Sequence, residues 1–224
     1  MSNVNVPGID VYNELNPTLT SPYSNFELPF AQTKESLMDV EDYRNFLNNA
    51  IARFRKSRTY KHYKGFLIDL GLNRCQMHGN ITVDMATVEM HHNLLTIFDI
   101  AHIICEHVIN TYGYITTFDL VLLLAEAHKK HKVQLVMLSL TPHQLYHNSD
   151  MIIHPDMCFG KWWEFLEEYN KGITLDVANK LIININEALK VGTSDDNGLL
   201  ELREKIKDWR NLNEYGYLRG NYSI

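Results

Sequence analysis

The chain has few cysteines, no long apolar run and no excess of positive charge. Its three cysteines, Cys75, Cys105 and Cys158, lie far apart, and no two have the C-x2-C spacing of a redox or zinc motif. An odd number of scattered thiols argues against a disulfide framework and favours a reducing compartment. The apolar runs are too short to cross a bilayer, and the first residues lack the basic and apolar regions of a secretory signal. We therefore expect a cytoplasmic protein with no membrane partner.

The bulk composition is typical of a soluble globular protein. Hydrophobic residues make up 45% of the 224 positions and charged residues 21%. This length suits one domain with appendages or two small domains. The formal net charge is −6. Because the molecule as a whole repels phosphate, any contact with nucleic acid has to come from a local basic patch.

The first segment, residues 1–34, is rich in proline. Four of the six prolines fall within the first 29 residues, among Asn, Ser and Thr. Such a segment cannot form a long helix, so we expect an extended or disordered arm. An arm of this kind either lies over a protein partner or remains a plain tail.

Residues 35–65 are predicted to be helical with a basic end. Apolar residues recur at three- and four-residue steps. The stretch "RFRKSRTYKHYKG" then contains six basic residues and no acid, here called the basic strip: Arg53, Arg55, Lys56, Arg58, Lys61 and Lys64. Two interpretations stay open. The strip is a solvated helix end favoured by the helix dipole, or it contacts nucleic-acid phosphates with tyrosines between the charges.

Two strands and a short helix are predicted further along. Alternation from Val83 to Met90 indicates a strand with an irregularity near Ala86, and "VQLVMLS" indicates a buried strand. The segment "LTPHQLYH" predicts a short helix with Thr141 as its N-cap and Pro142 at its first helical position.

Helical patterns fill most of the remaining chain. They occupy an interval of about 94–131 between the two predicted strands, and they return over residues 155–214 before a tail at 215–224. The predicted fold class is therefore α+β, mostly helical.

Histidines provide the candidate chemistry. "VEMHHN" places His91 and His92 side by side at the end of a strand, and "LTPHQLYH" places His143 and His147 four residues apart on a helix. Two imidazoles four residues apart lie on one helix face and can bind one metal ion. Each pair alone is a weak signal, because a chain with 11 histidines produces one by chance at about even odds. Their order along the chain is more specific: a strand ending in His-His, a second strand, then a helix with His-x3-His.

This order resembles the HNH endonucleases, whose site is a ββα-metal finger. The stretch "QLVMLSLTPHQLYH", residues 134–147, aligns without a gap with the family's second strand and metal-binding helix, and "CQMHGN…VEMHHN" is similar to its opening. The resemblance implies a ββα-metal finger at residues 66–154, embedded between helical segments, with 94–131 as a helical insertion. The family's structural zinc knuckle is degenerate here. Cys75 and His78 remain, but Ser139 and Pro142 stand in place of the other two cysteines.

The resemblance also assigns roles to the site residues. His91, His143 and His147 would bind one divalent metal ion, and the spacing leaves Zn, Mg, Mn and Ni open. His92 would be the general base, because neighbouring residues of a strand face opposite sides, one toward the metal and the other toward water. Gln134 stands in the place of the family's Asn, which orients the base, and its amide can form similar hydrogen bonds.

The function implied by the resemblance is a metal-dependent, HNH-type endonuclease that hydrolyses DNA phosphodiester bonds and contacts DNA through the basic strip. One alternative is a catalytically retired HNH-like finger acting as a binding or structural module, with a protein partner held by the N-terminal arm or the inserted helices. A second is a metal-binding regulator that holds DNA without cutting it. A small phage or mobile-element protein would fit either role, which would place it in the host cytoplasm, and the Asn-, Ile- and Lys-rich composition suggests a low-GC genome. If the four histidines are ordinary surface residues, there is no site.

Overall fold

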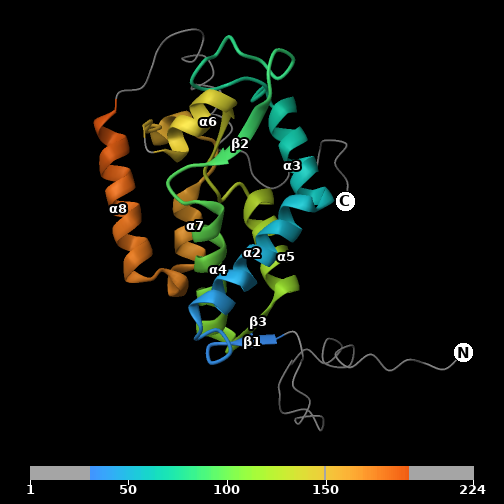
Figure 1. Cartoon of the computed structure of the whole chain (residues 1–224), viewed down its shortest axis with the longest axis vertical. Coiled ribbons are helices and arrows are strands. Elements are labelled where there is room, and N and C mark those ends of the chain that lie inside the picture. The colour runs from blue at the N-terminus through green and yellow to red at the C-terminus, as the bar shows by residue number, and fades with distance from the viewer. Residues whose placement is uncertain (1–30, 149, 192–224) are drawn as a thin grey trace, which may run out of the picture.

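The computed structural model describes residues 31–148 and 150–191 (Figure 1). Within these residues the helices are α2 (Val40–Lys56), α3 (Arg58–Asp69), α4 (Ile97–Tyr112), α5 (Thr117–Lys129), α6 (Leu140–His147), α7 (Trp162–Glu168) and α8 (Leu175–Lys190), with 3-10 turns η1 (Pro155–Met157) and η2 (Asn170–Gly172). The strands are β1 (Ala31–Thr33), β2 (Val88–His92), β3 (Tyr114–Thr116) and β4 (Leu135–Ser139). The predicted fold class, α+β and mostly helical, is confirmed.

Helices α2, α4 and α5 pack against one another and form the main core. Helix α4 is apolar on most of its surface, as expected for a helix covered on several sides. It begins at a capping box in which Thr96 and Asp99 each accept a hydrogen bond from the other's backbone N–H. It ends at Gly113, whose φ of +86° lies in the left-handed region that glycine adopts without strain.

Two small antiparallel sheets join segments that are distant in sequence. Strand β1 pairs with β3, and β2 pairs with β4 in the register His91 to Val136 and His92 to Leu135. Helix α6 follows β4 without a connecting loop. Strands β2 and β4 with helix α6 therefore form a compact ββα unit, which lies beside α3 in Figure 1.

The C-terminal part of the described chain covers helix α4. Gly172 approaches this helix so closely that a Cβ atom there would lie 1.8 Å from the carbonyl oxygen of Ile103. Helix α8 lies at the edge of the molecule (Figure 1). Lys180 Nζ on α8 contacts Asp99 Oδ2 at 2.6 Å. The α8 residue Asn184 donates a hydrogen bond to the carbonyl of Leu94, with an N···O distance of 2.9 Å.

Some element boundaries differ from those predicted. The basic segment breaks into two helices at Ser57, whose hydroxyl accepts a hydrogen bond from the backbone N–H of Tyr60 and caps α3. Strand β2 begins at Val88 rather than Val83. Helix α6 has Ser139, not Thr141, as its N-cap.

Other predictions concern residues outside the described part of the chain. These are the proline-rich arm up to residue 30, the helix expected over 199–214 and the tail at 215–224. Among the described residues, no helix has both the length and the apolar character needed to cross a membrane.

Candidate metal centre

Strand β2 places its two histidines on opposite sides of the hairpin, as the alternation of a strand requires. His91 faces helix α6, and its ring lies 4.9 Å from the rings of both His143 and His147, measured between centroids. His92 faces helix α5 and contacts His128. The neighbouring imidazoles therefore have different surroundings.

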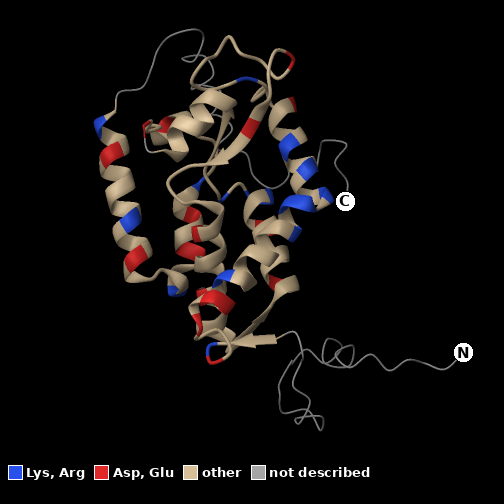
Figure 2. Ribbon diagram, viewed as in Figure 1, with Lys and Arg blue, Asp and Glu red and all other residues tan. Residues whose placement is uncertain are grey.

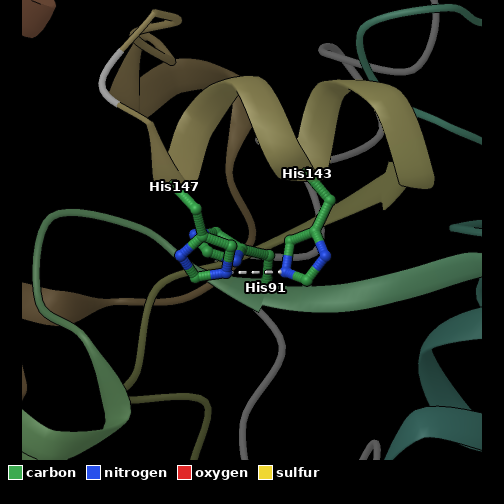
Figure 3. Close-up of side chains that lie close together, drawn as sticks. All are labelled: His91, His143 and His147. Atoms are coloured by element: carbon green, nitrogen blue, oxygen red, sulfur yellow. Dashed lines mark hydrogen bonds between the residues drawn. The ribbon is translucent and has the colours of Figure 1, made fainter.

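The three histidines predicted as metal ligands converge at one point. Residues His143 and His147 project from one face of α6 toward His91 on β2 (Figure 3). Each of the three offers a ring nitrogen, and these nitrogens all lie within 4.8 Å of one another. His143 Nε2 and His147 Nε2 are 3.1 Å apart, a hydrogen bond in which one ring donates to the other.

A carboxylate behind the cluster orients one of the ligands. Glu89 Oε2 lies 2.9 Å from His143 Nδ1. An Nδ1–H that donates to this carboxylate leaves the lone pair of His143 on Nε2, the atom that faces the other imidazoles. A hydrogen bond of this kind to the second ring nitrogen accompanies nearly all metal-binding histidines.

The ring of His91 is suited to bind a metal ion rather than a proton. Its Nε2 is buried and has no hydrogen-bond partner, which is costly for a polar atom unless something else satisfies it. Burial, together with the neighbouring His143 and His147, lowers the pKa of His91 to about 3. The ring is therefore neutral at pH 7, and a neutral imidazole with an unused lone pair is the donor that a transition metal needs. The three residues present thus fit the metal predicted for them.

His92 has a different environment from the one a general base requires. Its side chain is only 6% exposed, and its Nε2 lies 2.9 Å from His128 Nε2. His128 in turn donates from Nδ1 to the carbonyl of Leu124 at 2.6 Å, so its Nε2 is the acceptor for His92. Burial and the neighbouring His128 hold the pKa of His92 well below its usual range.

Gln134 braces a loop instead of contacting His92. Its Oε1 accepts a hydrogen bond from Asn93 Nδ2 at 3.2 Å, and its Nε2 donates to the carbonyl of Pro155 at 3.2 Å. The hydroxyl of Tyr146 donates to Asn93 Oδ1 at 2.8 Å. Gln134 thus helps to connect the end of β2, helix α6 and the η1 turn.

A cleft of about 440 Å³ opens beside the histidine cluster. Three side chains from the basic segment also line it: Arg55, Tyr60 and Lys64. Figure 2, in which Lys and Arg positions are blue on the ribbon, shows several of them along α3 and at the end of α2. The other four members of the basic strip do not line this cleft: Arg53, Lys56, Arg58 and Lys61.

A buried amide lies in the segment where the resemblance predicted a degenerate zinc knuckle. Cys75 is completely buried as a free thiol. The next residue, Gln76, accepts a hydrogen bond from the backbone N–H of Met137 at 2.7 Å and donates through its side chain to the carbonyl of Met157. Hydrogen bonds from Gln76 therefore connect the segment before β2 to β4 and η1.

Comparison with known protein families shows which family the chain belongs to. Residues 7–211 match the model of the bacteriophage G278-like virion protein family. The chain belongs to this family. Comparison with curated proteins and with solved structures gives no match.

Membership of the virion protein family confirms the predicted phage association and corrects the predicted function. The prediction of a metal-dependent DNA endonuclease is wrong, because the family that covers nearly the whole chain is one of virion proteins. The surroundings of His92 agree with this correction. A general base must reach the proton that it abstracts, whereas His92 is buried and bonded to His128.

Sequence reasoning missed Glu89, which contacts the centre, and His128, which lies on the other side of the hairpin against His92. Glu89 lies two positions before His91, on the same face of the strand, so its place beside the ligands could have been read from the alternation. His128 left no such signal, since its burial depends on α5 packing against the far side of β2.

Proposed function

We propose that this chain is a structural component of a phage particle in which His91, His143 and His147 bind one divalent transition-metal ion. The convergence of three ring nitrogens within 4.8 Å is the observation on which the proposal rests. In this role the ion is a cross-link that fastens helix α6 to strand β2. Before assembly, the protein resides in the host cytoplasm.

Helix α6 is an element that such a cross-link would stabilise. It has eight residues, too few for a stable helix without tertiary support. Pro142 is its one buried residue, and Leu140 and Leu145 are exposed. Besides Pro142, Tyr146 packs against the core and donates to Asn93. Ligation of His143 and His147 would add a further attachment to this short helix.

The donor set favours borderline metals. Three imidazole nitrogens suit Zn²⁺, Ni²⁺ and Cu²⁺, whereas Mg²⁺ and Mn²⁺ prefer oxygen ligands. A fourth position would open toward the cleft and be taken by water. The arrangement of β2, β4 and α6 also supports the proposal that this unit is HNH-like in fold, with no cleavage reaction attached to it.

Metal titration tests the proposal directly. We expect purified full-length protein to bind one Co²⁺ with a visible absorption spectrum typical of nitrogen ligation, and Zn²⁺ to displace it and raise the melting temperature. His143→Ala should weaken binding by about 100-fold and abolish the shift in melting temperature. His62→Ala, which changes an exposed histidine away from the cluster, should behave as the wild type. Equal affinity in the two variants would refute the assigned ligands.

Nucleic-acid contact is a second candidate function, favoured by the position of Arg55 and Lys64 in the cleft. Phosphate binding by two cations should weaken steeply with salt. Fluorescence anisotropy with labelled single- and double-stranded DNA provides the measurement. An Arg55→Ala, Lys64→Ala variant should lose affinity, whereas Arg53→Ala, Lys61→Ala, with the same charge change outside the cleft, should not. Equal loss in both variants would indicate a diffuse charge effect.

A further inference from the structure

Helix α8 presents a line of large aliphatic side chains to solvent beside its buried face. The buried face consists of three residues: Val177, Leu181 and Ala188. Beside it, Leu175 is 76% exposed, Ile182 57% and Leu189 62%. These last three residues, here called the α8 stripe, are seven positions apart, nearly two turns, so they lie on one line along the helix. The outer side of a surface helix is normally polar, and a continuous aliphatic line indicates that another apolar element covers it.

The chain continues past α8 with a segment of matching character. The family match extends to residue 211, beyond the end of α8 at Lys190, so the family's model includes most of this segment. Residues 191–198, "VGTSDDNG", are rich in residues that form turns. In residues 199–212, "LLELREKIKDWRNL", apolar side chains recur at steps of three, four and three positions: Leu199, Leu202, Ile206 and Trp209. This spacing, with charged residues between, predicts an amphipathic helix.

We propose that residues 199–212 form a helix that packs antiparallel against the α8 stripe of the same chain. The connection of eight residues, 191–198, is within the range of about 2–8 residues that joins neighbouring helices in bundles. Helices joined by so short a connection pack antiparallel to each other. The apolar side of the segment would then cover the aliphatic line that α8 exposes.

The spacing of the two apolar lines agrees with this arrangement. Leu189 and Ile182 are seven residues apart on α8, and Leu199 and Ile206 are seven residues apart on the segment. In an antiparallel pair, Leu199 opposite Leu189 therefore places Ile206 opposite Ile182, about 10.5 Å further along both helix axes. Trp209 then lies toward the start of α8, where its large ring covers the remainder of the stripe.

The short connection favours a segment of the same chain over a second copy as the occupant. A flexible linker of this length holds the two helices at an effective concentration in the millimolar range. A single helix of 16 residues offers less area than the roughly 800 Å² per partner that a stable interface between separate molecules buries. A contact of this size is therefore sufficient within one chain but not between two chains.

Paramagnetic relaxation in the full-length protein tests where the segment lies. A nitroxide attached to Ile182→Cys should broaden the amide NMR signals of residues 199–212. The three native cysteines are buried, so the label should attach to the introduced thiol alone. Leu122→Cys is the matched control, because Leu122 is also exposed but belongs to α5, which lies on the other side of α4 from α8 (Figure 1). A label at position 122 should leave these signals sharp.

Hydrogen exchange tests which face of α8 is covered. In the wild type, the amides of residues 199–212 should exchange at least about tenfold more slowly than in an unfolded peptide, because a docked helix is protected. Ile182→Glu should raise their exchange to the rate of the unfolded peptide, and Ile206→Glu should do the same from the other side of the contact. Ile183→Glu should leave the exchange slow, because Ile183 is 60% exposed but turned about 100° from Ile182. Unchanged protection of helix α4 in every variant would show that all of them fold.

Four outcomes would overturn the proposal. Fast exchange of residues 199–212 in the wild type would show that the segment does not dock. Equal acceleration by Ile182→Glu and Ile183→Glu would exclude the α8 stripe as the specific contact. Slow exchange without broadening from position 182 would place the segment on another surface. Broadening in a mixture of spin-labelled protein without isotope and isotope-enriched protein without spin label would show that the segment of a second copy occupies the stripe.

Discussion

At the residue scale, the metal centre depends on which nitrogen of each imidazole bears a proton. Glu89 settles this for His143 by accepting from Nδ1 at 2.9 Å. The charge of Glu89 also raises the pKa of His143, but burial has the larger and opposite effect, so the pKa lies below its ordinary value. Glu89 therefore positions a ligand that remains neutral at pH 7.

Replacing Glu89 with glutamine tests this positioning role. Glu89→Gln keeps the size of the side chain but removes the charge that holds the Nδ1 proton. Zn²⁺ affinity should fall by about 10-fold to 100-fold, as expected for loss of a hydrogen-bond partner behind a ligand. Without metal, the pKa of His143 should decrease further, and NMR titration of the His143 ring would measure it.

The control for this change is Glu164→Gln. Glu164 on helix α7 pairs with Lys161 at 3.2 Å and is not a member of the histidine cluster. This variant should leave both the Zn²⁺ affinity and the pKa of His143 unchanged. A decrease in affinity without any change in that pKa would mean that Glu89 acts through packing alone.

At the scale of elements, the sequence predicted those parts whose signals are local. Strand β4 was predicted from a run of apolar residues, and α6 from Thr141 and Pro142 near its start. The convergence of His91 with α6 followed from the resemblance to a ββα finger. Local patterns and a known arrangement together were therefore sufficient to assemble the three proposed ligands.

Boundaries set by tertiary contacts were harder to predict. The alternation from Val83 onward suggested a longer strand, but β4 offers only five residues for pairing, so β2 begins at Val88. One helical segment was predicted over residues 35–65, although the hydroxyl of Ser57 caps a new helix within it. The partner of His92 was unpredictable for a similar reason, because its identity depends on how α5 packs against the hairpin.

At the scale of the whole molecule, buried histidines link folding to pH. His128 and His131 are almost completely buried, and burial lowers the pKa of each to about 4. Both pKa values should return to about 6.5 in the unfolded chain. The unfolded state then binds more protons than the folded state below neutral pH, so stability should be complete above about pH 6.5 and decrease as the pH falls toward 4.

The size of this effect is large relative to the stability of a typical domain. A difference of about 2.5 pH units between folded and unfolded pKa values corresponds to about 3 kcal/mol for each histidine once it is fully protonated. Total unfolding free energies are only about 5–15 kcal/mol. We therefore expect the protein to unfold in mildly acidic solution, before most of its carboxylates are protonated.

Urea unfolding between about pH 7.5 and pH 5 measures this linkage, with a chelator present so that metal binding does not contribute. The free energy of unfolding should be nearly constant above pH 7 and decrease steeply below about pH 6.5.

His128→Gln replaces the accepting Nε2 with an amide oxygen that can still receive the proton of His92. This variant should reduce the proton uptake on unfolding by up to one, whereas His62→Gln, at an exposed position, should leave it unchanged. An identical pH slope in the wild type and His128→Gln would contradict this prediction, because it would mean that His128 is protonated to the same extent in the folded and unfolded states. The complete burial of His128 against His92 and Phe54 argues for a difference between the two states.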